Sequence, residues 1–262
     1  RPYKRIEQLE LVAEGPEQTE DLIQSGRWGG PADLRRILAY QKIRGDLTNV
    51  FYSMEASSTD FFAHQFKPIL KFIESPTGRI LIADEVGLGK TIEAIYIWKE
   101  IQAREKARRL LIVCPAMLRE KWKEDLLRLF AIEAEICNAS SVFSKLEIAR
   151  RSPNSTDFVI ISSLEGLRPQ RNFLEGGETS TRIKVAQVLK EVSDNIEDPL
   201  LDLVVVDEAH YLKNPETRSH LLGKLLADAS RHLLLLTATP VHVGSENLFN
   251  LLRLLDPEHY SN

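Results

Sequence analysis

The sequence predicts an α/β fold in which a mainly parallel central sheet is flanked by helices. Apolar, β-type runs alternate with helical patterns from residue 79 onward, which is typical of a parallel sheet with crossover helices on its faces. The β-branched run at residues 203–206 has the composition of a strand buried on both faces. A glycine-bearing turn at residues 84–91 joins an apolar run to a helical pattern. Together these observations predict a doubly wound sheet.

Five strands are expected, each followed by a helix. The expected strands are residues 79–83, 109–114, 158–162, 202–206 and 232–237. The expected helices are residues 90–104, 116–130, 140–151, 182–193 and 216–228. Between the third and fourth strands the chain is polar and contains Gly176, Gly177 and Pro199, so we expect a loop and a helix that projects from the sheet edge.

The chain is expected to contain an N-terminal helical extension, residues 1–55, and one α/β lobe, residues 56–262. In the extension, apolar residues at helical spacing follow a Pro-Ala-Asp start signal at residues 31–33. Its Arg and Lys side chains suit a nucleic-acid face or a solvated helix face, and we favour the solvated face. The first residue is Arg1 rather than Met, so we expect the sequence to be a piece of a longer protein.

The composition is that of an ordinary globular protein. Of 262 residues, 43% are hydrophobic and 27% are charged, and no apolar run reaches the roughly 18 residues that a membrane span needs. The start, RPYKRIEQLE, lacks a signal-peptide pattern. Cys114 and Cys137 lie in or near apolar runs without metal-ligand spacing, so we expect reduced core thiols. We therefore expect a cytoplasmic protein without a membrane partner.

The charge balance is slightly acidic. The chain has 34 Lys and Arg against 38 Asp and Glu, a net charge of −4, whereas a dedicated nucleic-acid binder is usually basic. Phosphate contact is local, however, and eight basic against four acidic residues lie between Arg104 and Arg128. A nucleic-acid partner is therefore compatible with this charge.

The turn at residues 84–91 has the features of a phosphate-binding loop. Gly87 and Gly89 allow the backbone to bend so that its N–H groups face phosphate oxygens. Lys90 would bring an ammonium group to the β and γ phosphates, and Thr91 would offer a hydroxyl to magnesium at a helix start. For this loop alone, a chance surface turn is the alternative, because Asp84 stands where the phosphate-loop pattern G-x-x-x-x-G-K-[ST] has its first glycine. The residues expected to bind the nucleotide, ATP or GTP, are Asp84, Glu85, Val86, Gly87, Leu88, Gly89, Lys90 and Thr91.

Asp207 and Glu208 directly follow the apolar run of the fourth strand. They are thus expected at the carboxyl end of a parallel strand, where ligands of open α/β sheets bind. Asp207 would hold magnesium through water, and Glu208 would position or deprotonate the water that attacks the γ-phosphoryl group. The alternative is that both acidic residues only cap a helix start. We favour catalytic roles for Glu208, Asp207 and Lys90, because both halves of a nucleotide site are present.

Four stretches resemble, in content and order, motifs I, Ia, II and III of superfamily 2 helicase-like ATPases. They are DEVGLGKT (residues 84–91), IVCPAMLREKW (112–122), DEAH (207–210) and LLLLTATP (233–240). The sequence DEVGLGKTIEA at residues 84–94 is similar to the corresponding motif of the Swi/Snf-type branch, especially of the prokaryotic group that contains the RNA-polymerase-associated ATPase. The resemblance implies a RecA-like lobe that binds ATP and magnesium. It also implies that Gln65, in the Q-type stretch at residues 61–73, hydrogen-bonds the adenine edge and selects ATP over GTP.

The resemblance implies a grip on the nucleic-acid backbone at motif Ia. A helix that starts after the strand would present its N-terminal N–H groups and two basic side chains to a phosphate. Serine hydroxyls at the end of the third strand would make the next backbone contact. Trp122, spaced like its apolar neighbours on one helical face, is expected to pack in the core, with base stacking as the alternative. The residues expected to contact nucleic acid are Pro115, Arg119, Lys121, Ser162 and Ser163.

Motif III is expected to couple the nucleotide site to the nucleic acid. Thr237 and Thr239 come after the apolar run of the fifth strand, residues 233–236, and would hydrogen-bond His210 or Asp207. A partly buried histidine with a purely structural role is the alternative for His210. We favour coupling because DEAH and TAT occur together.

The resemblance implies the first RecA-like lobe of an ATPase whose intact form uses ATP to move along double-stranded DNA and remodel bound complexes. The implied partners are nucleic acid, above all double-stranded DNA, a second RecA-like lobe, and a polymerase or other protein complex. No second lobe follows motif III in this chain, and that lobe supplies arginine fingers, so we expect these 262 residues alone to be nearly inactive. One alternative is a strand-separating DNA or RNA helicase. Another is a nucleotide-dependent interaction or switch module, which the near-neutral charge favours.

Overall fold

The computed structural model describes residues 63–85, 87–153, 155–169, 180–193, 199–238 and 244–260. The chain divides into two units, Arg1–Phe51 and Tyr52–Asn262, and every described residue belongs to the second. The helix expected in the N-terminal extension lies outside the described residues. The extension and its boundary at residue 55 therefore stay predictions.

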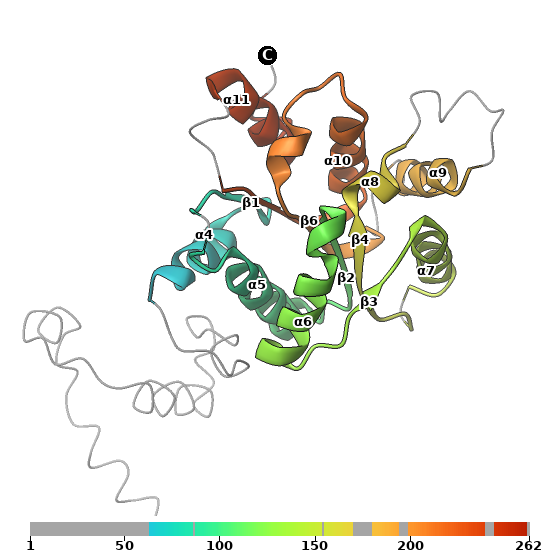
Figure 1. Ribbon diagram of the computed structural model, residues 1–262, viewed down its shortest axis with the longest axis horizontal. Coiled ribbons are helices and arrows are strands. Elements are labelled where there is room, and N and C mark those ends of the chain that lie inside the picture. Colours follow the sequence, from blue (N-terminus) through green and yellow to red (C-terminus); the bar gives the residue numbers. More distant parts are fainter. Residues whose placement is uncertain are drawn as a thin grey trace, which may run out of the picture. The chain divides into compact units, whose positions relative to one another are not determined.

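Six parallel strands form one sheet in the described part of the chain, in the order β1-β6-β5-β2-β4-β3 (Figure 1). The strands are β1 (Arg79–Ile82), β2 (Arg109–Cys114), β3 (Glu135–Ile136), β4 (Phe158–Ser163), β5 (Leu201–Val206) and β6 (Ser230–Leu236). The parallel sheet and the five expected strands are confirmed. Strand β3 was not expected, because two residues are too few to show alternation.

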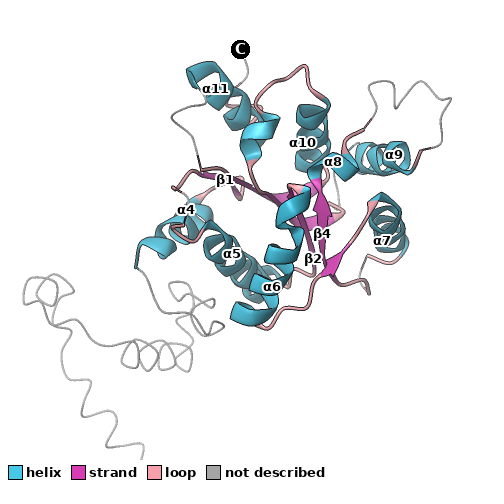
Figure 2. Ribbon diagram, viewed as in Figure 1, coloured by secondary structure: helices cyan, strands magenta, loops and turns pink. Residues whose placement is uncertain are grey.

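Helices cover both faces of this sheet (Figure 2). Helices α4, α5 and α6 pack next to one another on one face, and α7, α9, α10 and α11 follow one another on the other. The elements are η3 (Ala63–Phe66), α4 (Lys67–Glu74), α5 (Lys90–Glu105), η4 (Ala116–Leu118), α6 (Arg119–Phe130), α7 (Ala139–Arg151), α8 (Leu164–Leu167), α9 (Thr181–Ser193), η5 (Ala209–Leu212), α10 (Arg218–Asp228) and α11 (Gly244–Leu255). All five expected helices form, and the second begins as the 3-10 turn η4. None of the described helices is both long and apolar enough to cross a membrane.

Helix α9 packs into the molecule, so the prediction that it projects from the sheet edge is wrong. It contacts α7 and α10, and its Val185, Leu189 and Val192 are buried. These residues are spaced by four and three positions, which places them on one helical face. The prediction failed because the polar residues before and after the helix were given more weight than this spacing.

The two cysteines are buried free thiols, as expected. Burial raises the pKa of Cys114 to about 12 and that of Cys137 to about 11. Both thiols therefore stay protonated near neutral pH, and a protonated thiol is a poor nucleophile.

A buried carboxylate aligns the central strands at their amino ends. Asp202, at the start of β5, accepts hydrogen bonds from the backbone N–H groups of Arg108 and Arg109, each at 2.8 Å. The Arg109 guanidinium lies 3.4 Å from the other oxygen of the same carboxylate. Because β2 and β5 run in parallel from this point, their carboxyl ends also lie side by side.

Candidate functional site

The carboxyl ends of four neighbouring strands bring the predicted nucleotide residues together. Val206, the last residue of β5, is in register with β2 and β6. Just beyond the strands, the N–H of Asp207 donates to the carbonyl of Val113 at 2.8 Å, and the N–H of Thr237 donates to the carbonyl of Ile82 at 3.0 Å. The loop after β1, the acidic pair after β5 and the start of motif III therefore lie at one edge of the sheet.

Two glycines give the loop after β1 a backbone that side chains rarely adopt. The φ angles are 92° at Gly87 and 97° at Gly89. A Cβ atom at Gly89 would lie 2.5 Å from Nε2 of Gln65, so a side chain there would clash as well. Helix α5 starts directly after Gly89, and its first N–H groups therefore face the loop. Val86 lies outside the described residues.

The Lys90 ammonium folds back onto its own loop. Its Nζ donates to the carbonyl of Asp84 at 2.6 Å and to that of Glu85 at 3.0 Å. A phosphate oxygen is a stronger, charged acceptor for the same donor. Thr91 follows in the first turn of α5 and is half-buried. The ammonium and the hydroxyl thus start from the helix end that favours anions.

Gln65 lies beneath the loop. Its side chain is buried, and Nε2 donates to the carbonyl of Leu88 at 3.3 Å. Its Oε1 has no hydrogen-bond partner among the residues that the structure describes. A buried acceptor without a partner is costly. The exocyclic amine of adenine would satisfy it, whereas guanine carries an acceptor at that position. The adenine contact stays a prediction, and this atom supports it.

In the acidic pair after β5, two hydrogen bonds hold the carboxylate of Asp207. Oδ2 of Asp207 accepts from the indole Nε1 of Trp122 at 2.9 Å, and Oδ1 accepts from the N–H of Glu208 at 2.8 Å. Glu208 has a left-handed backbone, with φ 53° and ψ 47°, which is uncommon for a residue with a side chain. Its carboxylate makes no capping hydrogen bond to η5. A helix cap therefore does not account for this side chain.

His210 lies beside Glu208. Its Nδ1 is 3.0 Å from Oε2 of Glu208, but the two atoms are not aligned as a hydrogen bond. The contact is therefore mainly electrostatic and attractive when the imidazole is protonated. Thr237 is buried at the end of β6, and Thr239 lies outside the described residues. The relay from His210 to these threonines stays a prediction.

Sequence reasoning missed Glu93, which is fully buried in α5 behind the loop. In the described part of the chain, no hydrogen-bond donor reaches either of its carboxyl oxygens. Burial and, after it, the nearby Asp84 carboxylate raise the pKa of Glu93 to about 8, although Lys90 acts to lower it. A protonated Glu93 can donate to Asp84, which an ionised one cannot.

We expect the free energy of unfolding to fall between about pH 5 and pH 8 because of Glu93. Its pKa is higher in the folded state, about 8, than the usual 4.5, so the folded state holds this proton more tightly. The stabilisation is complete below the unfolded pKa and is lost as the pH rises through the folded one. Urea unfolding without nucleotide or magnesium, in the wild type and in Glu93→Gln, checks this. Parallel pH profiles in the two proteins would contradict it.

Two of the predicted nucleic-acid residues have basic side chains near the end of β2. Lys121 is exposed, and Nε of Arg119 donates to the carbonyl of Ala116 at 3.1 Å. Pro115 is buried and is followed by the turn η4, so the first full helical turn starts at Arg119 rather than directly after the proline. The contact of these residues with nucleic acid stays a prediction.

Ser162 does not fit the predicted contact with a phosphate. Its side chain is buried, and its hydroxyl donates to the carbonyl of Cys137 at 2.9 Å. A hydroxyl that is buried and paired cannot reach a nucleic-acid backbone. Ser163 accepts from the N–H of Gly166 at 3.0 Å and caps the short helix α8. Its contact with nucleic acid stays a prediction.

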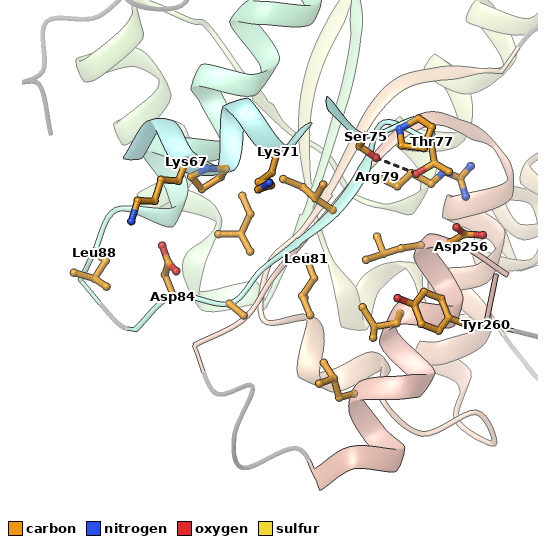
Figure 3. Close-up of a pocket in the computed structure, with 18 residues that line it drawn as sticks. Lys67, Lys71, Ser75, Thr77, Arg79, Leu81, Asp84, Leu88, Asp256 and Tyr260 are labelled. Carbon is orange, nitrogen blue, oxygen red and sulfur yellow. Dashed lines mark hydrogen bonds between the residues drawn. The ribbon is translucent and has the colours of Figure 1, made fainter. Parts of the chain in front are cut away.

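A cavity of about 900 Å³ lies along the edge strand β1, next to the loop. Figure 3 shows Asp84 and Leu88 at one end of it and Asp256 and Tyr260 at the other. Neither Lys90 nor the acidic pair after β5 lines it. The cavity therefore borders the candidate site at Asp84 and Leu88 but does not contain Lys90, Asp207 or Glu208.

The donors at the strand ends fit magnesium. No group of three or more His, Cys, Asp or Glu in the described ranges could hold a metal ion as an all-protein cage. Magnesium is instead usually held by one or two protein oxygens, water and the phosphates of a nucleotide. The hydroxyl of Thr91 and the carboxylate of Asp207 are hard oxygen donors of this kind.

A family model and several relatives match this chain. The family model of the SNF2-related domain matches residues 47–262. The chain belongs to the SNF2-related domain family. A Bacillus subtilis protein named uncharacterized ATP-dependent helicase YqhH is 30% identical to this SNF2-related domain over 254 residues, 94% of this chain and 39% of that protein. The RNA polymerase-associated protein RapA of Photobacterium profundum is 37% identical over 185 residues, 70% of this chain and 17% of RapA.

Solved structures confirm the RecA-like fold of this SNF2-related domain. The SWI2/SNF2 ATPase core of Sulfolobus solfataricus, solved in complex with dsDNA, superposes with a TM-score of 0.54 at 20% identity, over 78% of this chain and 37% of that one. A second structure, of the Sulfolobus solfataricus SWI2/SNF2 ATPase core domain, gives a TM-score of 0.53 at 22% identity, over 77% of this chain and 36% of that one. The chain thus spans well under half the length of these relatives and structures.

Proposed function

We propose that this SNF2-related domain is the ATP-binding lobe of a DNA-dependent ATPase that couples hydrolysis to movement on double-stranded DNA and to remodelling of bound complexes. One observation carries the proposal: the loop at residues 84–91 and the pair Asp207 and Glu208 lie at one edge of the sheet. Phosphoryl transfer needs phosphate-binding donors and carboxylates that handle metal and water in the same place.

Each residue at this edge has a task in the proposed reaction. Lys90 would exchange its two loop carbonyls for the β and γ phosphates of ATP, and Gln65 would receive the adenine amine. Thr91 and Asp207 would hold magnesium, the first directly and the second through water. When bound, the ion neutralises charge on the phosphoryl oxygens. Glu208 would orient or deprotonate the attacking water.

The proposed partners follow from the relatives and from the surface near β2. RapA is named as RNA polymerase-associated, and the Sulfolobus core was solved with dsDNA, which supports a polymerase and duplex DNA as partners. Arg119 and Lys121 would contact the DNA backbone. A second RecA-like lobe in the intact protein would add arginine fingers, and residues 1–262 alone would hydrolyse ATP very slowly. The intact protein would act in the cytoplasm.

The proposal is tested by ATP hydrolysis of the longest natural form of the protein, with and without duplex DNA, beside residues 1–262. We expect duplex to stimulate the long form and the short chain to be nearly inactive. Single-stranded DNA and RNA serve as matched controls for duplex. Rapid, DNA-stimulated turnover by residues 1–262 alone would contradict the assignment of arginine fingers to a second lobe.

The slightly acidic charge favours one other function, a nucleotide-dependent switch module in a larger complex. A switch binds ATP but need not respond to nucleic acid. A long form whose ATP turnover is unchanged by any nucleic acid would support the switch. Strand separation, measured with a labelled duplex, would identify a helicase instead.

A further inference from the structure

The buried side chain of Trp122 makes a polar contact that packing does not require. It lies in α6, and its Nε1 donates to Oδ2 of Asp207 at 2.9 Å, within the normal range for an N–H···O hydrogen bond. The two residues are 85 positions apart in the chain. Its spacing in the sequence predicted core packing for this indole, and its burial confirms that packing, but the hydrogen bond adds a second task.

The hydrogen bond leaves Asp207 with a defined orientation. Its other oxygen, Oδ1, is held by the N–H of Glu208 at 2.8 Å. A carboxylate with one donor on each oxygen cannot rotate about its last bond without losing at least one of them. Each oxygen still has a second lone pair. One of these can accept from a metal-bound water.

A second buried tryptophan shows what an indole without this task looks like. Trp98 in α5 is as buried as Trp122, but its Nε1 has no hydrogen-bond partner in the described residues. The two indoles therefore share burial and differ in their polar contact. Replacing either indole by phenylalanine keeps an aromatic ring at a buried position. Only Trp122→Phe also removes a hydrogen bond.

We propose that Trp122 is a positioning residue that orients the Asp207 carboxylate for magnesium; this rests on the proposed function of the site. Groups that hydrogen-bond a direct metal ligand typically change metal affinity by about 10- to 100-fold when they are removed. Because Asp207 would act through water, we expect a loss at the lower end of this range. Without the indole N–H, Asp207 keeps its charge but loses the donor that fixes Oδ2. We therefore expect the loss of this N–H group to weaken metal binding and to leave metal-free nucleotide binding unchanged.

The test compares wild type, Trp122→Phe and Trp98→Phe in the intact protein. Mn²⁺ replaces magnesium so that bound metal can be counted by electron paramagnetic resonance in the presence of ATP, without relying on hydrolysis. Binding of a fluorescent ATP analogue in EDTA gives the metal-free affinity. We expect Trp122→Phe to bind Mn²⁺ about 10-fold more weakly, with metal-free nucleotide affinity unchanged. Trp98→Phe should match wild type in both measurements.

Three results would overturn the proposal. Wild-type Mn²⁺ affinity in Trp122→Phe would show that the hydrogen bond does not position Asp207. An equal loss of Mn²⁺ in both variants would show a general packing defect. Loss of metal-free nucleotide binding in Trp122→Phe would show that the indole supports the fold of the site. By contrast, a wild-type protein that bound no ATP even in the presence of a divalent metal would refute the proposed function itself.

Discussion

Glu208→Gln is expected to lower ATP hydrolysis by the intact protein by about 10²- to 10⁴-fold, the usual contribution of a general base. The substitution keeps the size of the side chain and its left-handed backbone, for which φ is 53°. It removes the charge that would attract the proton of the attacking water, and it also removes the electrostatic contact with His210. Since Glu208 is not expected to hold the phosphates, ATP affinity should stay unchanged. Phosphate release and binding of a fluorescent ATP analogue measure the two effects separately.

Glu216→Gln is the matched control, because Glu216 is exposed in the turn between η5 and α10. The same chemical change there should leave turnover at the wild-type level. If Glu208→Gln hydrolysed ATP at the wild-type rate, the base would have to lie elsewhere in the intact protein.

Lys90→Ala is expected to weaken ATP binding itself, by about 10- to 100-fold. A hydrogen bond to a charged group contributes about 1.5–3 kcal/mol, and about 1.4 kcal/mol corresponds to a tenfold change in affinity. The ammonium also holds the carbonyls of Asp84 and Glu85, at 2.6 Å and 3.0 Å, so its removal loosens the loop before any phosphate arrives. Equilibrium binding of ATP with magnesium measures the loss.

Lys224→Ala in α10 removes an exposed ammonium and should bind ATP like the wild type. If Lys90→Ala matched this control, the loop would hold phosphate through backbone N–H groups alone. Together, the two substitutions separate turnover from binding, because Glu208 would act on the attacking water and Lys90 would bind the phosphates.

Much of the candidate site was predictable because its residues are adjacent in the sequence. Gly89, Lys90 and Thr91 belong to one continuous stretch, and the structure places it where the loop after β1 passes into α5, as expected. Asp207 and Glu208 follow a strand whose apolar run is long enough to recognise. That these stretches meet followed from the rule that parallel strands end at one edge.

In the candidate site, the wrong prediction and the omission both concern the direction of side chains. Ser162 was expected to face nucleic acid, but its place in β4 turns the hydroxyl toward Cys137. Successive residues of a strand point to opposite faces, and a short, almost uniformly apolar strand gives no alternation from which to choose. Glu93 was overlooked because a glutamate in an amphipathic helix usually faces water, whereas this one is fully buried.

The sequence by itself determined the five longer strands and the helix that follows each, the phosphate loop and the acidic pair, because periodic spacing and short contiguous patterns carry this information. Only the tertiary structure decided that Trp122 holds Asp207, that Glu93 lies buried near Asp84, and that α9 packs between α7 and α10. The physical reason is the same for all three. Periodic spacing can mark a buried face, as in α9, but the partners of that face depend on strand register and helix placement, which the spacing does not specify.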